Sequence, residues 1–165
     1  MNVAIEPLLF RDCCYVAANI RDEDWNECRC QLESENKFEL ASQSFFLTDA
    51  DLRWCLKVRG QPAAAMGLAR TGPTLYQAWM WGTRHVSRGF PTMIRFLNTS
   101  VRQNLLDRGV LRVEVRALET HEFVRRGWIA RMGAADCGLL HKYGKNGENF
   151  RLYAWWKGME EHVLL

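Results

Sequence analysis

The residues best suited to bind a ligand lie in a short basic loop that runs from Gly82 to Gly89. The loop holds two arginines, Arg84 and Arg88, between its two glycines. Pro91 fits the first position of a following helix, and Phe90, the expected N-cap, has no side-chain oxygen to accept a helix N–H. Free N–H groups at such a helix start attract an anion, so the loop predicts a phosphate-type site. A crossover helix that follows a solvated loop is the alternative interpretation.

Two strands and one helix must position this loop. Thr74–Trp81 is rich in aromatic and apolar residues, which is typical of a buried strand. The helix after Pro91 has one apolar stripe, formed by Met93, Leu97, Val101 and Leu105. Gly109 is expected to end that helix, and Val110–Leu118 alternates as a strand does. This order predicts two parallel neighbouring strands joined by a right-handed crossover.

The remaining pattern predicts an α/β domain that covers residues 1–165. Further strands are expected at Val3–Leu9, Leu52–Arg59, Ala63–Arg70, Cys137–Tyr143 and Phe150–Trp156. Helices are expected at Phe10–Ile20, at Arg21–Cys30 with Asp22 as its cap, and at Glu119–Met132, while Gln31–Ser44 is expected to be a turn or helix that leads into a loop. Together these elements predict a mixed, mostly antiparallel seven-strand sheet.

The last two strands have their own signals. Asn146-Gly147 between them is a strong hairpin signal. One of Trp155 and Trp156 is expected in the core, since the final strand is rich in large apolar side chains.

The composition favours a globular protein of the cytoplasm. Hydrophobic residues make up 48% of the chain and the net charge is +3. No apolar run approaches the roughly 18 residues of a membrane helix, and the N-terminus does not have the pattern of a secretory signal. The six cysteines include no CxxC pair, so we expect reduced thiols and no metal site.

Charge is distributed unevenly along the sequence. Met1 to Asp51 contains eleven acidic and four basic residues, whereas Arg84 to Arg131 contains ten arginines and four acidic residues. Arginine is suited to bind phosphate oxygens through its planar fork of N–H donors. Solvated arginines on the outer faces of helices are the alternative for about half of them.

The order of elements, with a basic loop after the fourth strand, resembles the GNAT superfamily of acetyl-CoA-dependent N-acyltransferases. The resemblance covers nearly the whole chain and is strongest from Thr74 to Trp156. In detail, the segments CCYVAANIRDEDWNE and WGTRHVSRGFP are similar to those of small phage-encoded GNAT-like acetyltransferase proteins. The resemblance implies helices on both faces of a sheet that splays between its fourth and fifth strands.

The resemblance also implies a site for acetyl-CoA, with its pantetheine arm between those two strands and its pyrophosphate on the basic loop. The implied cofactor-binding residues are Met80, Trp81, Arg84, Ser87, Arg88, Gly89, Phe90 and Thr92. Backbone N–H groups of Met80 and Trp81 could polarise the acetyl carbonyl if the strand bulges there. The sequence departs from the family pattern at Pro91 and Met93, where small residues are usual, and at Ile129, where a tyrosine acid is common.

Acetyl transfer to an amine also needs a group that removes a proton. Glu119 and His121 are the predicted catalytic residues, since they follow the fifth strand at the edge where the sheet would open. The alternative is that the acidic residues there only favour a helix start. His85 is a further candidate for the group that removes the proton. The alternative is that His85 lies beside the phosphate or in solvent.

Other residues with reactive or polar side chains have weaker signals. Tyr76 and Gln77 could line a groove for the acceptor, or could simply pack within the sheet. Cys137 is not expected to be a nucleophile, because no His–Asp pattern accompanies it.

Two functional hypotheses follow. The first is a phage-encoded N-acetyltransferase that acts in the host cytoplasm and modifies an amine on a host protein or a small molecule. The second is a GNAT-fold protein without catalysis that binds a host or virion protein. Nucleic-acid binding is a weaker third hypothesis, because no recognisable module accompanies the arginines.

Overall fold

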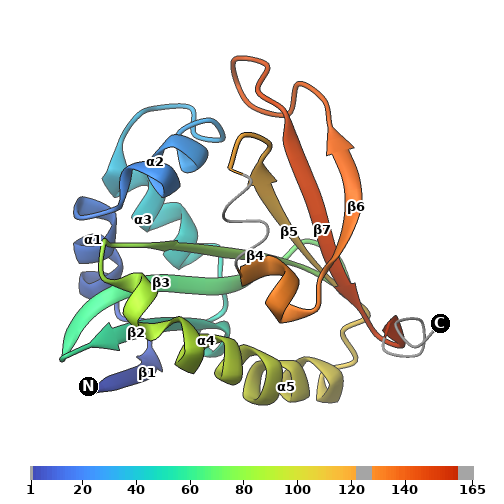
Figure 1. Ribbon diagram of the computed structural model, residues 1–165, viewed down its shortest axis with the longest axis horizontal. Coiled ribbons are helices and arrows are strands. Elements are labelled where there is room, and N and C mark those ends of the chain that lie inside the picture. The colour runs from blue at the N-terminus through green and yellow to red at the C-terminus, as the bar shows by residue number, and fades with distance from the viewer. Residues whose placement is uncertain (1, 122–127, 160–165) are drawn as a thin grey trace.

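The computed structural model describes residues 2–121 and 128–159. It contains one seven-stranded sheet with the order β1-β2-β3-β4-β5-β7-β6, as the ribbon in Figure 1 shows. The strands are β1 (Val3–Pro7), β2 (Arg53–Val58), β3 (Gln61–Arg70), β4 (Leu75–Gly82), β5 (Arg112–Leu118), β6 (Ala135–Leu140) and β7 (Phe150–Trp156). All neighbouring strands are antiparallel except β4 and β5, which are parallel. The predicted mixed, mostly antiparallel sheet is thus confirmed.

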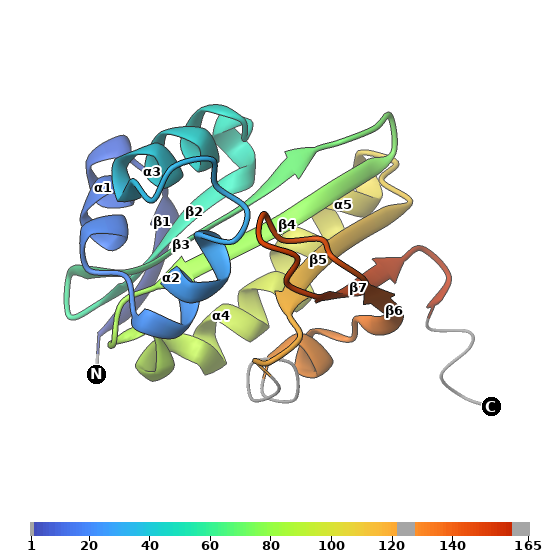
Figure 2. The same cartoon turned by 90° about the horizontal axis from the view of Figure 1, so that it is seen from above.

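Helices lie on both faces of the sheet, as Figure 2 shows from above. They are α1 (Phe10–Ala18), α2 (Asp22–Cys28), α3 (Lys37–Phe46), α4 (Phe90–Phe96) and α5 (Arg102–Asp107). Three-residue or four-residue helical turns occur at Ala50–Leu52, Val86–Gly89 and Ala130–Met132. In the part of the chain that the structure describes, no helix has the length and apolar character that crossing a bilayer requires.

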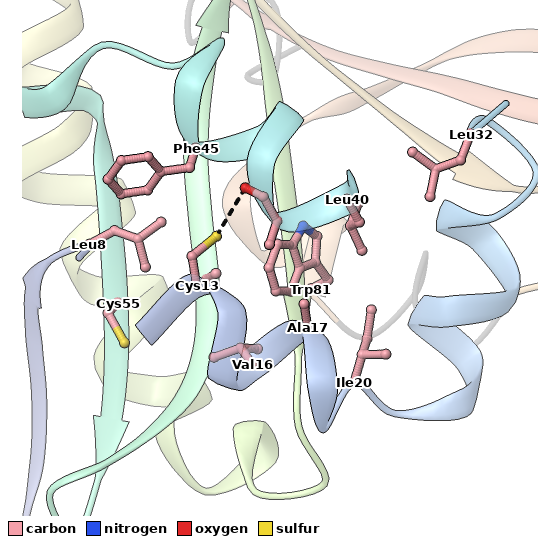
Figure 3. Close-up of a cluster of buried hydrophobic side chains, with 12 residues drawn as sticks. Leu8, Cys13, Val16, Ala17, Ile20, Leu32, Leu40, Phe45, Cys55 and Trp81 are labelled. Carbon is pink, nitrogen blue, oxygen red and sulfur yellow. Dashed lines mark hydrogen bonds between the residues drawn. The ribbon is translucent and has the colours of Figure 1, made fainter. Parts of the chain in front are cut away.

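The core is divided between the two faces of the sheet. On one face, α1 and α3 pack against β2, β3 and β4 through residues that include Cys13, Val16, Ala41 and Trp81, drawn in part in Figure 3. On the opposite face, α5 packs against the sheet through Leu105 and neighbouring apolar residues. Burial of these apolar surfaces is the main stabilisation of both layers.

The crossover helix after the basic loop differs from the regular helix that was expected. A π-helical turn, Leu97–Val101, lies between α4 and α5. The Thr99 hydroxyl donates to the Arg95 carbonyl at 2.8 Å within this stretch, a bond that commonly bends helices. The apolar stripe nevertheless faces the protein interior as predicted, because Met93, Val101 and Leu105 are buried.

Several expected boundaries are wrong by one or a few residues. The N-cap of α4 is Gly89 rather than Phe90, and Arg21 rather than Asp22 precedes α2. The Gln31–Ser44 stretch is a short connection followed by a full helix, α3, whose N-cap Asn36 accepts a bond from the Phe38 N–H. The predicted helix Glu119–Met132 falls partly outside the described residues.

The C-terminal hairpin is longer than its sequence signal indicates. The connection between β6 and β7 covers residues 141–149, and Gly147 adopts a positive φ of 88°. The loop docks onto the first half of the chain, because the Lys145 N–H donates to the Cys30 carbonyl at 2.8 Å. Trp155 and Trp156 are only half-buried, so the prediction that one of them lies in the core is wrong. The buried residues of β7 are Phe150, Tyr153 and Ala154.

The cysteines should differ in thiol reactivity according to how deeply they are buried. All six are free, and burial raises the pKa of the Cys13 and Cys55 thiols to about 12. Because the thiolate is the reactive form, we expect iodoacetamide at pH 8 to modify the exposed Cys137 in the folded protein and to spare Cys13 and Cys55 until unfolding. Mass spectrometry of the alkylated peptides measures this. Modification of Cys13 at the rate of Cys137 would contradict the packing of α1 described above.

Candidate functional site

The sheet forks between β4 and β5. Their parallel pairing covers only Leu75–Gln77 with Arg112–Glu114, although β4 continues to Gly82 and β5 to Leu118. Beyond the paired residues β5 follows β7, and the two strands diverge from β4, as Figure 1 shows. The expected splay between the fourth and fifth strands is therefore present.

The backbone of β4 presents hydrogen-bonding groups to this fork. β4 pairs with β3 without a bulge from Tyr76 to Gly82. The Thr83 N–H donates to the Ala63 carbonyl on the β3 side, at 2.8 Å. Since N–H directions alternate along a strand, Trp81 also points its N–H toward β3, while Met80 points its N–H into the fork. The bulge that would turn both groups to one site is absent, and of the two only the Met80 N–H faces the fork.

Two cavities open at the fork, one on each face of the sheet. The larger cavity, about 290 Å³, lies on the α1–α3 face. The smaller cavity, about 110 Å³, lies on the α4–α5 face and is almost wholly apolar. The two share the lining residues Ala78, Trp79, Met80, Val115 and Trp128. The two cavities together are called the slot below, and the Met80 N–H lies on their shared wall.

Two stacked tryptophans shape the slot. The rings of Trp79 and Trp81 lie 5.8 Å apart at an interplanar angle of 25°. The Trp79 indole N–H donates to the Thr48 hydroxyl at 2.9 Å, which fixes the ring against the turn after α3. A Cβ at Gly67 would approach the Trp79 ring to 2.7 Å, so only glycine admits the ring in this position.

Glu27 on α2 supplies a carboxylate to the larger cavity. Its Oε2 accepts the Leu118 N–H at 2.8 Å, at the end of β5. The same oxygen lies 3.6 Å from Nδ1 of His121. The carboxylate is thus held at the edge of the fork with an imidazole behind it, and a carboxylate in this position is suited to accept a proton.

The sequence-predicted catalytic residues separate in the structure. His121 lies beside Glu27, as described, with 17% of its side chain exposed. Glu119 turns away to the β6–β7 connection, where its carboxylate accepts the Asn149 side-chain N–H at 3.1 Å. His85 lies next to Arg84 in the basic loop, and the Nε atom of Arg84 is 3.4 Å from Nε2 of His85.

The remaining candidates are also placed. Gln77 lines the larger cavity, whereas Tyr76 is buried against α5. Cys137 is exposed on β6 and lies 3.6 Å from the guanidinium of Arg112.

The basic loop forms a helical turn, not an open cradle. Residues Val86–Gly89 run directly into α4. The Arg88 N–H donates to the His85 carbonyl at 3.2 Å, and the Phe90 N–H donates to the Ser87 carbonyl. These two amide groups are therefore engaged within the chain, while the side chains of Arg84, Ser87, Arg88 and Thr92 are exposed.

Gly89 has a packing role in this loop. A Cβ there would lie 2.6 Å from Cδ2 of Leu56, which is fully buried on β2. Glycine thus lets the start of α4 approach the sheet closely, and this brings the basic loop to the end of β4.

An ion pair ties α2 to the end of β4. Arg21 donates from Nε and Nη2 to the two carboxylate oxygens of Asp24, each at 2.8 Å. Oδ2 of Asp24 also accepts the Gly82 N–H at 2.7 Å, and the Arg21 N–H donates to the Gly82 carbonyl. Because Glu27 lies one helical turn after Asp24, this network fixes the carboxylate at the fork.

Sequence reasoning missed Glu27, Thr48 and Asp24. The acidic run DEDWNEC was interpreted as part of the Arg21–Cys30 helix, with Asp22 as its cap, and as part of the family resemblance. Its three-residue spacing between Asp24 and Glu27 places both side chains on one helical face, which is the signal that could have identified them.

Comparisons with known proteins agree with this geometry. No protein-family profile and no curated protein matches the sequence. Solved structures do match: an N-acetyltransferase from Staphylococcus aureus Mu50 superposes with a TM-score of 0.71 and 11% identity, over 94% of this chain and 99% of that one. A ribosomal-protein-alanine N-acetyltransferase from Brucella melitensis gives 0.69 and 14%, over 93% and 99%.

An acetyltransferase of the GNAT family from Bacillus anthracis gives a TM-score of 0.68 at 11% identity, over 94% of this chain and 95% of that one. At such identities the likeness concerns the backbone alone. The fold of this chain is that of the GNAT acetyltransferases.

Proposed function

We propose that the protein is an N-acetyltransferase that transfers an acetyl group from acetyl-CoA to an amine. The observation that supports this most is the forked sheet, with a cavity on each face and the Met80 N–H on the shared wall. A slot of this kind can admit an acetylated thiol from one face and an amine from the other. The acetyltransferases with which the chain superposes make the same chemistry plausible.

Different groups at the fork and in the basic loop suit different parts of acetyl-CoA. The smaller, apolar cavity and the Met80 N–H suit a pantetheine chain and its acetyl group. The pyrophosphate would be held by the exposed guanidinium groups of Arg84 and Arg88 and by the side chains of Ser87 and Thr92. The engaged amide groups of Arg88 and Phe90 leave fewer free hydrogen-bond donors than an open glycine-rich loop would. We therefore propose that side chains supply most of the contacts to the pyrophosphate.

When bound, acetyl-CoA would supply a thioester. In the transfer its C–S bond breaks as the C–N bond to the amine forms, the amine loses one proton, and the departing thiolate takes up one proton to leave as the thiol. We assign the proton of the amine to the Glu27 carboxylate, which lines the cavity where the amine would enter. His121 stabilises and orients Glu27 from behind, and the Leu118 N–H fixes its Oε2. Glu119, bonded to Asn149, has no part in this proposal.

Calorimetric titration with acetyl-CoA tests the proposal. We expect the wild type to bind, and Arg84→Ala/Arg88→Ala to weaken binding by about tenfold, since two charge-assisted contacts to phosphate are lost. Raised salt should weaken wild-type binding more than that of the double variant. Arg11→Ala, which removes an exposed cation from α1, is the matched control and should bind as the wild type does.

Absence of binding at millimolar acetyl-CoA would refute the proposal. Equal binding by wild type and the Arg84/Arg88 variant would show that the pyrophosphate lies elsewhere.

A second function is favoured by one observation. The amide groups of Arg88 and Phe90 bond within the chain, and an enzyme that has lost its cofactor could have such a loop. In that case the protein would bind and modulate a host or virion protein without catalysis. The phage origin, the host cytoplasm and a host partner rest on the sequence resemblance and are proposed with it.

A further inference from the structure

Among the described residues that line the larger cavity, one charged side chain of each sign is present. Glu27 supplies a carboxylate, and Arg116 on β5 supplies a guanidinium. The two groups have other partners and do not pair with each other. Glu27 accepts the Leu118 N–H and lies beside His121. Arg116 donates from Nη1 to the Tyr143 hydroxyl. A ligand that carries both charges would therefore meet a complementary group for each of them.

The Arg116 guanidinium has room for an anion. In the described part of the chain, no carboxylate lies within ion-pair distance of it. Glu114, the preceding acid on the same face of β5, is paired with Arg112, whose Nε lies 2.7 Å from Glu114 Oε1. The guanidinium lies 5.0 Å from the centroid of the Tyr143 ring. Since arginine has five N–H donors in a planar fork, the contacts with Tyr143 orient the group and leave donors for a carboxylate.

Arg116 and Glu27 are placed so that one small molecule can contact both. Side chains alternate along a strand, so Arg116 and Leu118 point to the same face of β5, where Leu118 packs with Cys30 after α2. Glu27 bonds to the Leu118 N–H, and two residues of a strand span about 7 Å. The other described residues of the wall offer amide, hydroxyl and apolar groups, among them the Gln77 side chain, and add no further charge.

We infer that the acceptor of the acetyl group is an amino acid, whose carboxylate is bound by Arg116 and whose amino group lies at Glu27. This inference rests on the proposed function. A simple amine would leave the guanidinium without an anion, and the amino terminus of a polypeptide has an amide in place of the carboxylate. A free amino acid provides a partner for both charges and can be contained in a cavity of about 290 Å³. Arg116 is then a specificity-determining residue, because it distinguishes an amino acid from the corresponding amine.

Ligand binding tests the inference without requiring turnover. The first probe is a mixture of the common amino acids with β-alanine and γ-aminobutyrate at millimolar concentration. Saturation-transfer NMR identifies those that bind the full chain, with coenzyme A present and absent. The amino acid that binds best is then titrated beside its decarboxylated amine and its carboxamide. We expect the amino acid to bind at least about tenfold more tightly than either, because both lack the anion that Arg116 would bind.

Substitutions of Arg116 then locate the carboxylate. Arg116→Gln should weaken amino acid binding by about tenfold and leave binding of the decarboxylated amine unchanged, which also shows that the variant is folded. Arg116→Lys keeps the charge without the planar fork and should retain part of the preference for the amino acid. Arg11→Gln removes a cation on α1 that is 80% exposed and does not line the larger cavity. This matched control should bind both ligands as the wild type does.

Each contrary result has a distinct meaning. Equal binding of the amino acid and its decarboxylated amine to the wild type overturns the inference, as does a mixture in which nothing binds. A tripeptide of the preferred amino acid that binds more tightly than the amino acid itself also overturns it and assigns the acceptor to a polypeptide. Acetyl-CoA binding without amino acid binding overturns the inference alone. Amino acid binding that depends on the carboxylate, with no acetyl-CoA binding, supports the Arg116 site and refutes the proposed function alone.

Discussion

Glutamine in place of Glu27 should lower kcat for acetyl transfer by on the order of 10²–10⁴-fold, the usual contribution of a general base. Glutamine has nearly the same shape and can still accept the Leu118 N–H that Glu27 Oε2 now accepts. It cannot take a proton from the amine. The fold and the affinity for acetyl-CoA should therefore remain, and the loss should fall on kcat.

Matched variants separate this role from a structural one. Glu119→Gln, which keeps the contact to Asn149, should change kcat little, although the sequence alone placed the catalytic base there. His121→Asn should have an intermediate effect and should shift the pH profile of kcat, because His121 lies 3.6 Å from Glu27 and acts through it. An unchanged kcat in Glu27→Gln, or equal losses in Glu27→Gln and Glu119→Gln, would exclude Glu27 as the base.

The fold could be predicted because its signals are local. The strand Thr74–Trp81 and the strand Val110–Leu118 each have a clear pattern, and the apolar stripe from Met93 to Leu105 defines the helix between them. A parallel pair follows from that order by the handedness of crossovers. The structure has this pair, with Tyr76 opposite Val113. The β6–β7 turn was less predictable, because Asn146-Gly147 forms part of a longer loop that bonds to Cys30.

The site was less predictable because its parts meet only in three dimensions. Glu27 and Leu118 are 91 positions apart, and no periodicity connects them. Glu119 and His121 stand two residues apart, yet one faces Asn149 and the other Glu27. The direction of a side chain beyond a strand depends on which element packs there, and α2 provides that element here.

The basic loop shows a different limit of sequence reasoning. Its residues were assigned to phosphate binding because an uncapped helix start has free amide groups. In the structure a preceding helical turn engages the Arg88 and Phe90 amides, and Gly89 is required by the packing of Leu56. These features of the loop thus serve its own packing. The exposed arginines are still predicted to bind phosphate, and the titration with acetyl-CoA tests this.

Removal of the Asp24 carboxylate should destabilise the protein strongly. The side chains of Arg21 and Asp24 are only 20% and 10% exposed, so Asp24→Ala leaves a largely buried guanidinium without its partner. It also leaves the Gly82 N–H without the acceptor that lies at 2.7 Å. Breaking a buried pair in this way costs about 3–5 kcal/mol, and urea unfolding followed by circular dichroism measures it. Asp22→Ala, at an exposed position in the same helical turn, should cost less than about 1 kcal/mol.

The intact pair is not expected to stabilise the fold by a comparable amount. Burial raises the pKa of Asp24 even though Arg21 and the Gly82 N–H oppose the shift, which shows that the desolvation of the charged carboxylate is large. The double variant Arg21→Met/Asp24→Leu, which removes both charges, should therefore be more stable than Asp24→Ala. Because the network positions α2, the double variant should still lose activity through a misplaced Glu27. A double variant as unstable as Asp24→Ala would show instead that the ion pair itself holds α2 against β4.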